Sequence, residues 1–342
     1  MIQIRNDMLK LGIFVGENNW AFFHEIYEDL SIHYSTDVFK PRTYYVPLLH
    51  GRVNEWAFQH GIRYMLNNRD VCFFEWASNL LATASHLPKK AKIVTRLHSF
   101  EIYDWAPHIN WKNVDWIIVL SQAMGRMFAD LYPEHAEKLV IIRNGCSLDK
   151  FCFFPKREFT FTLGMLSAIT PIKRTYEVVL ILDALIKKGY PAVLRIAGAP
   201  EGDERYVTAI YKLVEKLGLE NRIIFDGFVL DTPAWLKNVD IFISNSYWEG
   251  QQTALIEAMA SGCYCLAHCW NGADEMLPSD NIYLHDNELL EKIAAYAQLN
   301  TEQQFDLQVL MRSTAEERFD INSVKENIIG LIEAELHTRL EP

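Results

Sequence analysis

The fold is decided by the stretch Glu249-Gly250-Gln251-Gln252-Thr253-Ala254-Leu255-Ile256-Glu257-Ala258-Met259-Ala260-Ser261-Gly262, which holds two carboxylates eight positions apart. An apolar run at residues 240–244 leads into it, and a second at 263–269 follows it. This pattern predicts a strand, a polar turn, a helix that begins near Thr253, and another strand. Such a unit places ligands beyond the carboxyl ends of parallel strands.

The predicted helix start has the chemistry of a phosphate site. Its first backbone N–H groups, near Thr253 and Ala254, have no partner within the helix and can hold phosphate oxygens, helped by the helix dipole. Glu257 lies about one turn into the helix, where a carboxylate can accept hydrogen bonds from a ribose diol. Glu249, in the turn, can do the same for a hexose. Each glutamate alone is typical of a helix cap or an exposed helical side chain, but the pair favours a nucleotide-sugar site.

The rest of the chain alternates between strand and helix patterns. Apolar runs predict strands at residues 10–15, 71–76, 92–97, 116–120, 139–143, 159–166, 192–197 and 222–225. Helical periodicity is found at residues 20–33, 54–66, 80–86, 122–132, 173–187, 204–217, 288–299, 302–318 and 323–340. This alternation predicts an α/β architecture of parallel sheets with helices on both faces. Pro155-Lys156-Arg157 marks a linker, so we expect domains at 1–154 and 155–320 and a C-terminal helix at 321–342.

Several spaced segments resemble one family, the retaining family 4 glycosyltransferases, which carry an E-x7-E motif and the GT-B fold. Glu249 and Glu257 match that motif, and further similar segments are Ile142–Gly145 with Phe151, Arg195–Gly198, Ile224–Val229, Ser246–Gly250, and Gly272 with Glu275. The resemblance is strong from about Asn144 to Glu275 and much weaker before that. The spaced set is specific, whereas an isolated E-x7-E would not be.

The resemblance implies two Rossmann-like domains whose parallel sheets face each other across a cleft, with residues 321–342 crossing back to the first domain. It implies a hexosyltransferase that moves a hexose from a nucleotide sugar to an acceptor hydroxyl, with retention, in glycan, polysaccharide or glycoconjugate biosynthesis. The catalytic residues implied are His98, Glu249 and Lys173. The donor-binding residues implied are Gly164, Lys173, Arg174, Gly198, Val229, Glu249, Gly250, Thr253, Ala254 and Glu257.

Two departures from the family pattern affect these roles. Met165 stands where the family has an arginine, which leaves Lys173 as the main cation for the diphosphate and Arg174 as its helper or substitute. The loop after the first strand lacks the family's adjacent glycines, which puts the acceptor side in doubt. The acceptor-side residues that we expect are Gly16, Asn18, Asn19, Arg96 and Glu101.

Composition narrows the class of protein. The 342 residues carry a formal net charge of −11, which argues against nonspecific nucleic-acid binding. No apolar run reaches the ~20 residues of a membrane span, and the first residues lack a signal-peptide pattern. We therefore expect a cytoplasmic protein with at most peripheral membrane contact.

No carboxylate pair ends a strand in the manner of a metal–diphosphate site, so we expect no essential metal and no cofactor beyond the nucleotide-sugar substrate.

Two alternatives remain open at the level of sequence. One is a nucleotide-sugar epimerase or hydrolase of the same fold, which would consume donor without an acceptor. The other is a glycan-binding protein that has lost catalysis, for which Met165 and the altered first loop are the support. The acceptor is also open: a glycan, a lipid-linked glycan or a small molecule would each fit.

Overall fold

The computed structural model describes residues 8–16, 20, 23–45, 49–155 and 158–337. The chain forms two compact units, residues 1–143 with 324–342, and residues 144–323. The sequence predicts the first boundary after residue 154, but residues 144–155 belong with the second unit. Cys146 shows why, because its N–H donates to the carbonyl of Phe319 at 2.9 Å.

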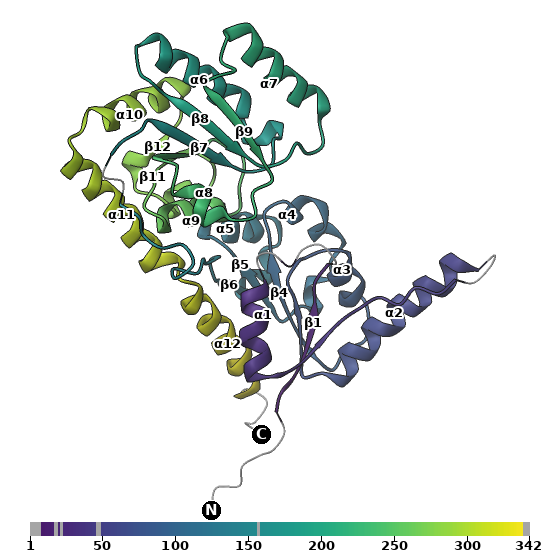
Figure 1. The fold of residues 1–342 in the computed structure, drawn as a ribbon. Coiled ribbons are helices and arrows are strands. Elements are labelled where there is room, and N and C mark those ends of the chain that lie inside the picture. The colour runs from purple at the N-terminus through teal and green to yellow at the C-terminus, as the bar shows by residue number, and fades with distance from the viewer. Residues whose placement is uncertain (1–7, 17–19, 21–22, 46–48, 156–157, 338–342) are drawn as a thin grey trace, which may run out of the picture. The chain divides into compact units, whose positions relative to one another are not determined.

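The first unit contains a six-stranded parallel sheet in the order β2-β1-β3-β4-β5-β6 (Figure 1). Its strands are β1 (Lys10–Phe14), β2 (Ser35–Val38), β3 (Val71–Phe74), β4 (Lys92–Leu97), β5 (Trp116–Val119) and β6 (Leu139–Ile141). Its helices are α1 (His24–His33), α2 (His50–Asn68), α3 (Asn79–Ser85), α4 (Glu101–Asp104) and α5 (Gln122–Leu131), with 3-10 turns η1 (Ala106–His108), η2 (Trp111–Asn113) and η3 (Pro133–Lys138). The order changes direction between β1 and β3, which makes their carboxyl ends a natural ligand site.

The second unit contains another six-stranded parallel sheet, in the order β12-β11-β10-β7-β8-β9. Its strands are β7 (Thr162–Leu166), β8 (Val193–Ala197), β9 (Ile223–Gly227), β10 (Ile241–Ser244), β11 (Tyr264–His268) and β12 (Ile282–Tyr283). Its helices are α6 (Thr175–Lys187), α7 (Glu204–Leu217), α8 (Thr232–Leu236), α9 (Thr253–Ala260), α10 (Asp286–Gln298) and α11 (Thr301–Phe319), with turns η4 (Pro171–Lys173), η5 (Ala273–Glu275) and η6 (Ser279–Asn281). The final helix, α12 (Ile321–His337), runs from this unit into the first.

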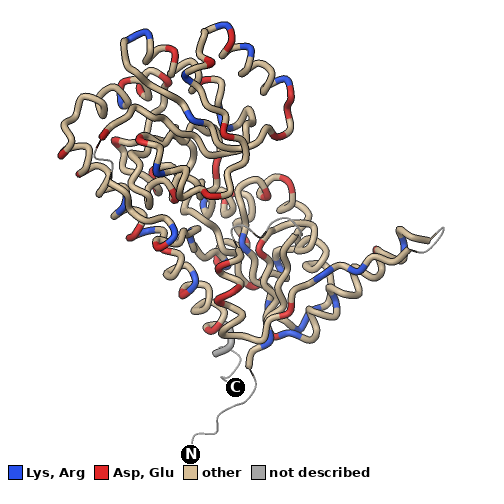
Figure 2. The backbone as a smooth tube through the Cα atoms, viewed as in Figure 1, with Lys and Arg blue, Asp and Glu red and all other residues tan. Residues whose placement is uncertain are grey.

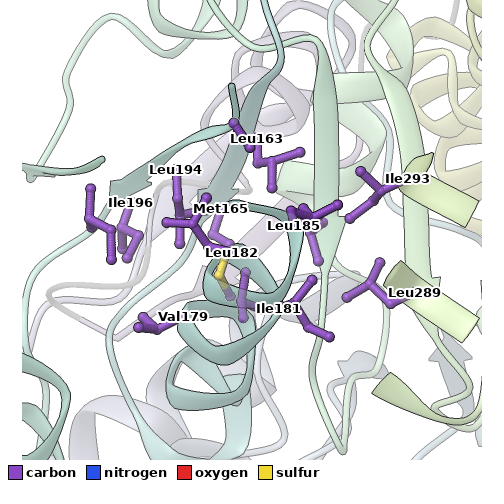
Figure 3. Close-up of a cluster of buried hydrophobic side chains, with 14 of the residues drawn as sticks. Leu163, Met165, Val179, Ile181, Leu182, Leu185, Leu194, Ile196, Leu289 and Ile293 are labelled. Atoms are coloured by element: carbon purple, nitrogen blue, oxygen red, sulfur yellow. The ribbon is translucent and has the colours of Figure 1, made fainter. Parts of the chain in front are cut away.

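Each sheet is covered by helices on both faces. In the second unit, one buried cluster joins the sheet to α6 and α10 through side chains such as Leu163, Met165, Leu182 and Ile293 (Figure 3). A second cluster on the other face joins it to α8, α9 and α11. The prediction of two Rossmann-like α/β domains is therefore confirmed. None of the helices within the described ranges combines the length and apolar character needed to cross a bilayer.

Among the strands and α-helices, four were not predicted: β2, α4, α8 and β12. Strand β2 is a sheet edge with an alternately half-exposed pattern, and its sequence, Ser-Thr-Asp-Val, carries no apolar run. Helix α8 has only five residues and follows the N-cap Asp231, whose side chain accepts from the N–H of Ala234. These elements depend on pairing and capping more than on periodicity, so the strand and helix patterns did not reveal them.

Gly164 lies in the middle of β7, where the sheet meets α8. A Cβ atom added there would lie 2.6 Å from a methyl carbon of Val239 and 3.0 Å from the ring of Trp235. Both neighbours are buried and cannot easily move. The glycine is thus required by packing within the unit, whatever part it plays toward a ligand.

We predict that Gly164→Ala lowers the melting temperature of the protein, because overpacking of a core costs about 1–3 kcal/mol. At this size, a loss of 1 kcal/mol corresponds to roughly 2–4 °C. Gly330→Ala is the matched control, since Gly330 lies inside α12 with nothing within 4 Å of an added Cβ. The control should hold or raise the melting temperature. Equal melting temperatures for Gly164→Ala and the wild type, by scanning calorimetry, would contradict the packing account.

Candidate functional site

The second unit carries polar side chains at the carboxyl edge of its sheet, where β7 and β10 lie side by side. These two strands are neighbours although β8 and β9 separate them in the chain. The segment after β7 forms η4, and the segment after β10 folds against it through a 2.9 Å hydrogen bond from the N–H of Tyr247 to the carbonyl of Ile172. Ligands bind at such positions in open α/β sheets.

Glu249 and Lys173, both predicted from sequence, meet at this edge. Lys173 Nζ lies 2.6 Å from Glu249 Oε1, and Ser246 Oγ donates to the same oxygen at 2.6 Å. The lysine and glutamate side chains are 20% and 12% exposed, so the pair is largely sheltered yet reachable. The structure therefore brings together the cation and the carboxylate that the sequence singled out. Ser246 was quoted within a motif but not assigned a role, although its spacing of three from Glu249 could have indicated one.

Arg174 is placed differently from Lys173. Its backbone adopts the left-handed conformation (φ 52°) between η4 and α6. Its buried guanidinium donates to Asp286 Oδ1 at 2.7 Å and to Asn245 Oδ1 at 3.3 Å, and it lies 4.9 Å from the ring centre of Tyr247. These contacts lock the end of β10 to the start of α6. Arg174 thus holds the loop that carries Lys173, and the sequence alone gave no sign of its partners.

The N-terminus of α9 is open to a ligand. The N-cap residue Gln252 makes no side-chain cap, and its buried Oε1 has no hydrogen-bond partner among the described residues. Within the same described part of the chain, the N–H groups of Thr253 and Ala254 make no hydrogen bond. The preceding turn is fixed by Gln251, whose Oε1 accepts from the N–H of Asn144 at 2.5 Å. The helix tip that the sequence predicted is therefore present, with free donors.

Glu257 lies one turn further along α9 in a largely buried position. Burial raises the pKa of its carboxyl to about 7, while the charge of Lys150 opposes this rise. A carboxyl in this range changes its charge near neutral pH, and ligand hydroxyl groups that donate to it would favour the charged form.

His268 also reaches the edge, from the end of β11. Its Nδ1 lies 3.1 Å from the carbonyl oxygen of Ser246, and burial together with the nearby Arg174 charge lowers its pKa. No role was predicted for it. The sequence offered one signal for such a role, because a histidine ends the apolar run that predicts a buried strand.

The remaining predicted donor residues have backbone or packing roles in the structure. Gly198 has φ +137°, and a Cβ there would lie 1.9 Å from the carbonyl oxygen of Ser167, so only glycine fits. Gly250 is buried in the turn, and Val229 is packed partly against the core. Met165, at the position of the family's arginine, is 2% exposed within the hydrophobic cluster.

The first unit holds a compact polar cluster at its own carboxyl edge. Glu75 follows β3, and its Oε1 accepts from Arg96 Nη1 at 2.6 Å. His98 follows β4, with Nε2 3.5 Å from the same oxygen, and its ring stacks on Trp76 at 3.9 Å. Glu101 Oε2 accepts from the N–H groups of His98 and Ala77 at 2.9 and 3.0 Å.

Charge within this cluster is controlled by burial. Burial lowers the pKa of His98; Glu75 opposes that change and Arg96 adds to it. Burial also raises the pKa of Glu101 to about 8. Arg96 and Glu101, predicted to touch an acceptor, are 0% and 1% exposed and serve instead to hold Glu75 and His98. Glu75 was not predicted.

The acceptor-side glycine, Gly16, is half-buried just after β1. Asn18 and Asn19 lie outside the described residues. The expectation of acceptor contacts from this loop therefore stays a prediction.

Part of this chain is similar in sequence to a family of known proteins. Residues 160–299 match the family model described as "Glycosyl transferases group 1". Protein CapJ of Staphylococcus aureus is 24% identical over 46% of this chain and 40% of its own. The poly(ribitol-phosphate) alpha-N-acetylglucosaminyltransferase of S. aureus strain COL is 26% identical over 54% of this chain and 36% of its own. The chain thus spans less than half the length of these two curated relatives.

The fold is shared over almost the whole chain with a solved structure. HepE from Anabaena, solved in complex with UDP and glucose, superposes with a TM-score of 0.75 at 20% identity and covers 96% of this chain and 100% of HepE. At this identity the similarity establishes the fold, which is GT-B. Residues 160–299 are thus similar to the group 1 glycosyltransferases, and nearly the whole chain shares the fold of HepE.

Proposed function

We propose that this protein is a glycosyltransferase that moves a hexose from a nucleotide diphosphate sugar to an acceptor hydroxyl with retention of configuration. It would act in glycan, polysaccharide or glycoconjugate biosynthesis. The contact of Lys173 and Ser246 with Glu249, in the unit that carries the open tip of α9, is the observation that supports this proposal most.

The two partners of the pair have different tasks in this scheme. Negative charge grows on the diphosphate as the glycosidic bond breaks, and a fixed cation stabilises that charge. Lys173 would turn from Glu249 to the diphosphate, whose oxygens also accept from Thr253 and Ala254. Glu249, still held by Ser246, would then accept hydrogen bonds from the donor hexose. This supply of positive charge is why we propose transfer without a metal.

His98 completes the proposed set. On the family resemblance it contacts the reacting sugar. Its lowered pKa keeps the imidazole neutral near pH 7, so that one ring nitrogen donates and the other accepts. Trp76 and Glu101 fix its ring and backbone, while Glu75 and Arg96 set the charge beside it.

We predict that Lys173→Met and Glu249→Gln each lower turnover by roughly 100-fold or more, because each removes a group that acts in the transition state. Donor consumption and transfer are measured together, with UDP-sugars tried first, since HepE was solved with UDP. Glu204→Gln, an exposed glutamate of α7, is the control and should leave turnover unchanged.

The outcomes of this experiment separate the alternatives. Wild-type rates should be equal with EDTA and with Mg²⁺; a strict requirement for Mg²⁺ would contradict the metal-free proposal. Donor consumption without an acceptor would indicate a hydrolase or epimerase. Nucleotide binding without turnover, for every donor and acceptor offered, would indicate the inactive glycan-binding protein.

A second prediction concerns Glu257. Its folded pKa of about 7 lies above the ordinary glutamate pKa of 4.5, so between these values the native state binds more protons than the unfolded state. The free energy of unfolding therefore falls as pH rises through this window. Glu257→Gln should remove this fall and be more stable than the wild type at pH 8, by up to about 3 kcal/mol.

Ligand binding, unlike folding stability, should gain from the negative charge of ionised Glu257. Wild-type affinity for a nucleoside diphosphate should rise from pH 6 to pH 8, because ionised Glu257 accepts better from ribose hydroxyls, and Glu257→Gln should lose this rise. Glu291→Gln, an exposed glutamate of α10, is the control. Parallel pH profiles for Glu257→Gln and the wild type, in calorimetric unfolding and in nucleotide titration, would refute the role.

A further inference from the structure

A groove in the first unit lies beside the carboxyl end of β2 and has no place in the chemistry described above. It has a cavity volume of about 390 Å³. The segment after β2 contributes Lys40, Arg42 and Tyr44, and one face of α2 contributes Trp56, His60 and Tyr64. Figure 1 shows the N-terminal half of α2 reaching away from the sheet of its own unit.

The α2 side of the groove is an exposed aromatic stripe. Trp56, His60 and Tyr64 are spaced by four residues and therefore share one helix face. The Trp56 and His60 rings stack at 5.0 Å with planes 13° apart, and Trp56 and Tyr64 are 66% and 55% exposed. Gly61 lets the helix come close to Phe39, since an added Cβ would lie 3.0 Å from that ring. Flat rings presented to solvent in a hollow are suited to the apolar faces of sugars.

The groove is also positively charged, in an acidic protein. The lining of the groove includes Lys40 and Arg42 and no acidic residue, and residues 37–70 carry a balance of +2, with five Lys and Arg against three Asp and Glu, whereas the whole chain carries −11 (Figure 2). Arg69 is paired with Asp37 at 2.6 Å. Lys40 and Arg42 are exposed and form no ion pair within the described ranges. Their charge is therefore available to an anionic ligand.

Topology puts this groove on the same side of the sheet as His98. All strands of the unit are parallel, so the carboxyl ends of β2, β1, β3 and β4 lie along one edge in that order. Neighbouring strands are about 4.8 Å apart, which separates the ends of β2 and β4 by about 14 Å. A ligand that reaches both positions must be chain-like.

We propose that this groove binds an anionic, chain-like glycan as the acceptor. The rings of Trp56, Tyr64 and Tyr44 would stack on sugar units, while Lys40 and Arg42 pair with carboxylate or phosphate groups on the chain. The inference rests on the proposed transferase function and specifies the class of its acceptor. A bilayer surface offers the same anions, but the rings and cations line a hollow, which fits a single chain better than a flat membrane.

The test measures binding of defined probes to the full chain by calorimetric titration. The probes are an oligogalacturonate, a malto-oligosaccharide of the same length, inorganic polyphosphate, and phosphatidylglycerol vesicles. We expect the oligogalacturonate to bind at least roughly tenfold more tightly than the neutral chain. K40Q/R42Q should weaken that binding by a similar factor, and Trp56→Ala should weaken oligogalacturonate binding while leaving polyphosphate binding unchanged.

The titration needs a control variant that removes a positive charge far from the groove in the chain. Arg205→Gln removes a cation of the second unit whose side chain is 93% exposed, and it should change nothing. Equal binding of polyphosphate and oligogalacturonate with no effect of Trp56→Ala, binding to vesicles alone, or no binding of any anion would each overturn the proposal.

Thermal shifts with nucleoside diphosphates are measured in parallel, and the groove variants should leave them unchanged. A wild type that shows no such shift would count against the proposed function, whereas a normal shift with an inert groove would count against this inference alone.

Discussion

The Lys173–Glu249 ion pair is the contact on which the rest of the site depends. It joins the loop after β7 to the loop after β10, across 76 positions of sequence, at the point where the sheet order reverses. An ion pair that remains partly exposed to solvent adds little to stability. We propose that its value lies in keeping a cation and a carboxylate together until a ligand carrying both phosphate and hydroxyl groups separates them.

Each unit uses a buried arginine to hold its polar edge. In the second unit Arg174 joins Asn245 and Asp286, and in the first Arg96 joins Glu75 beside His98. Buried ion pairs are poor sources of net stability, but breaking one leaves a costly unpaired charge. Arg174 therefore fixes the loop that carries Lys173, and Arg96 fixes Glu75 beside His98.

The sequence predicted strongly periodic elements closely and long-range contacts poorly. Residues 92–97 and 204–217 were predicted as a strand and a helix with the observed bounds. The edge strand β2 lacked an apolar run, so only its pairing with β1 reveals it. Glu249, Lys173 and Glu257 followed from motif spacing. Glu75 and Asp286 did not, because their partners lie 21 and 112 positions away and no local pattern encodes such contacts.

The most direct test is a crystal structure of the protein with a nucleoside diphosphate bound. The account predicts phosphate density within hydrogen-bonding distance of the Thr253 and Ala254 amides, with Lys173 Nζ turned from Glu249 toward it and the ribose beside Glu257. Nucleotide density elsewhere on the second unit, with the Lys173–Glu249 contact intact and the tip of α9 empty, would contradict the account.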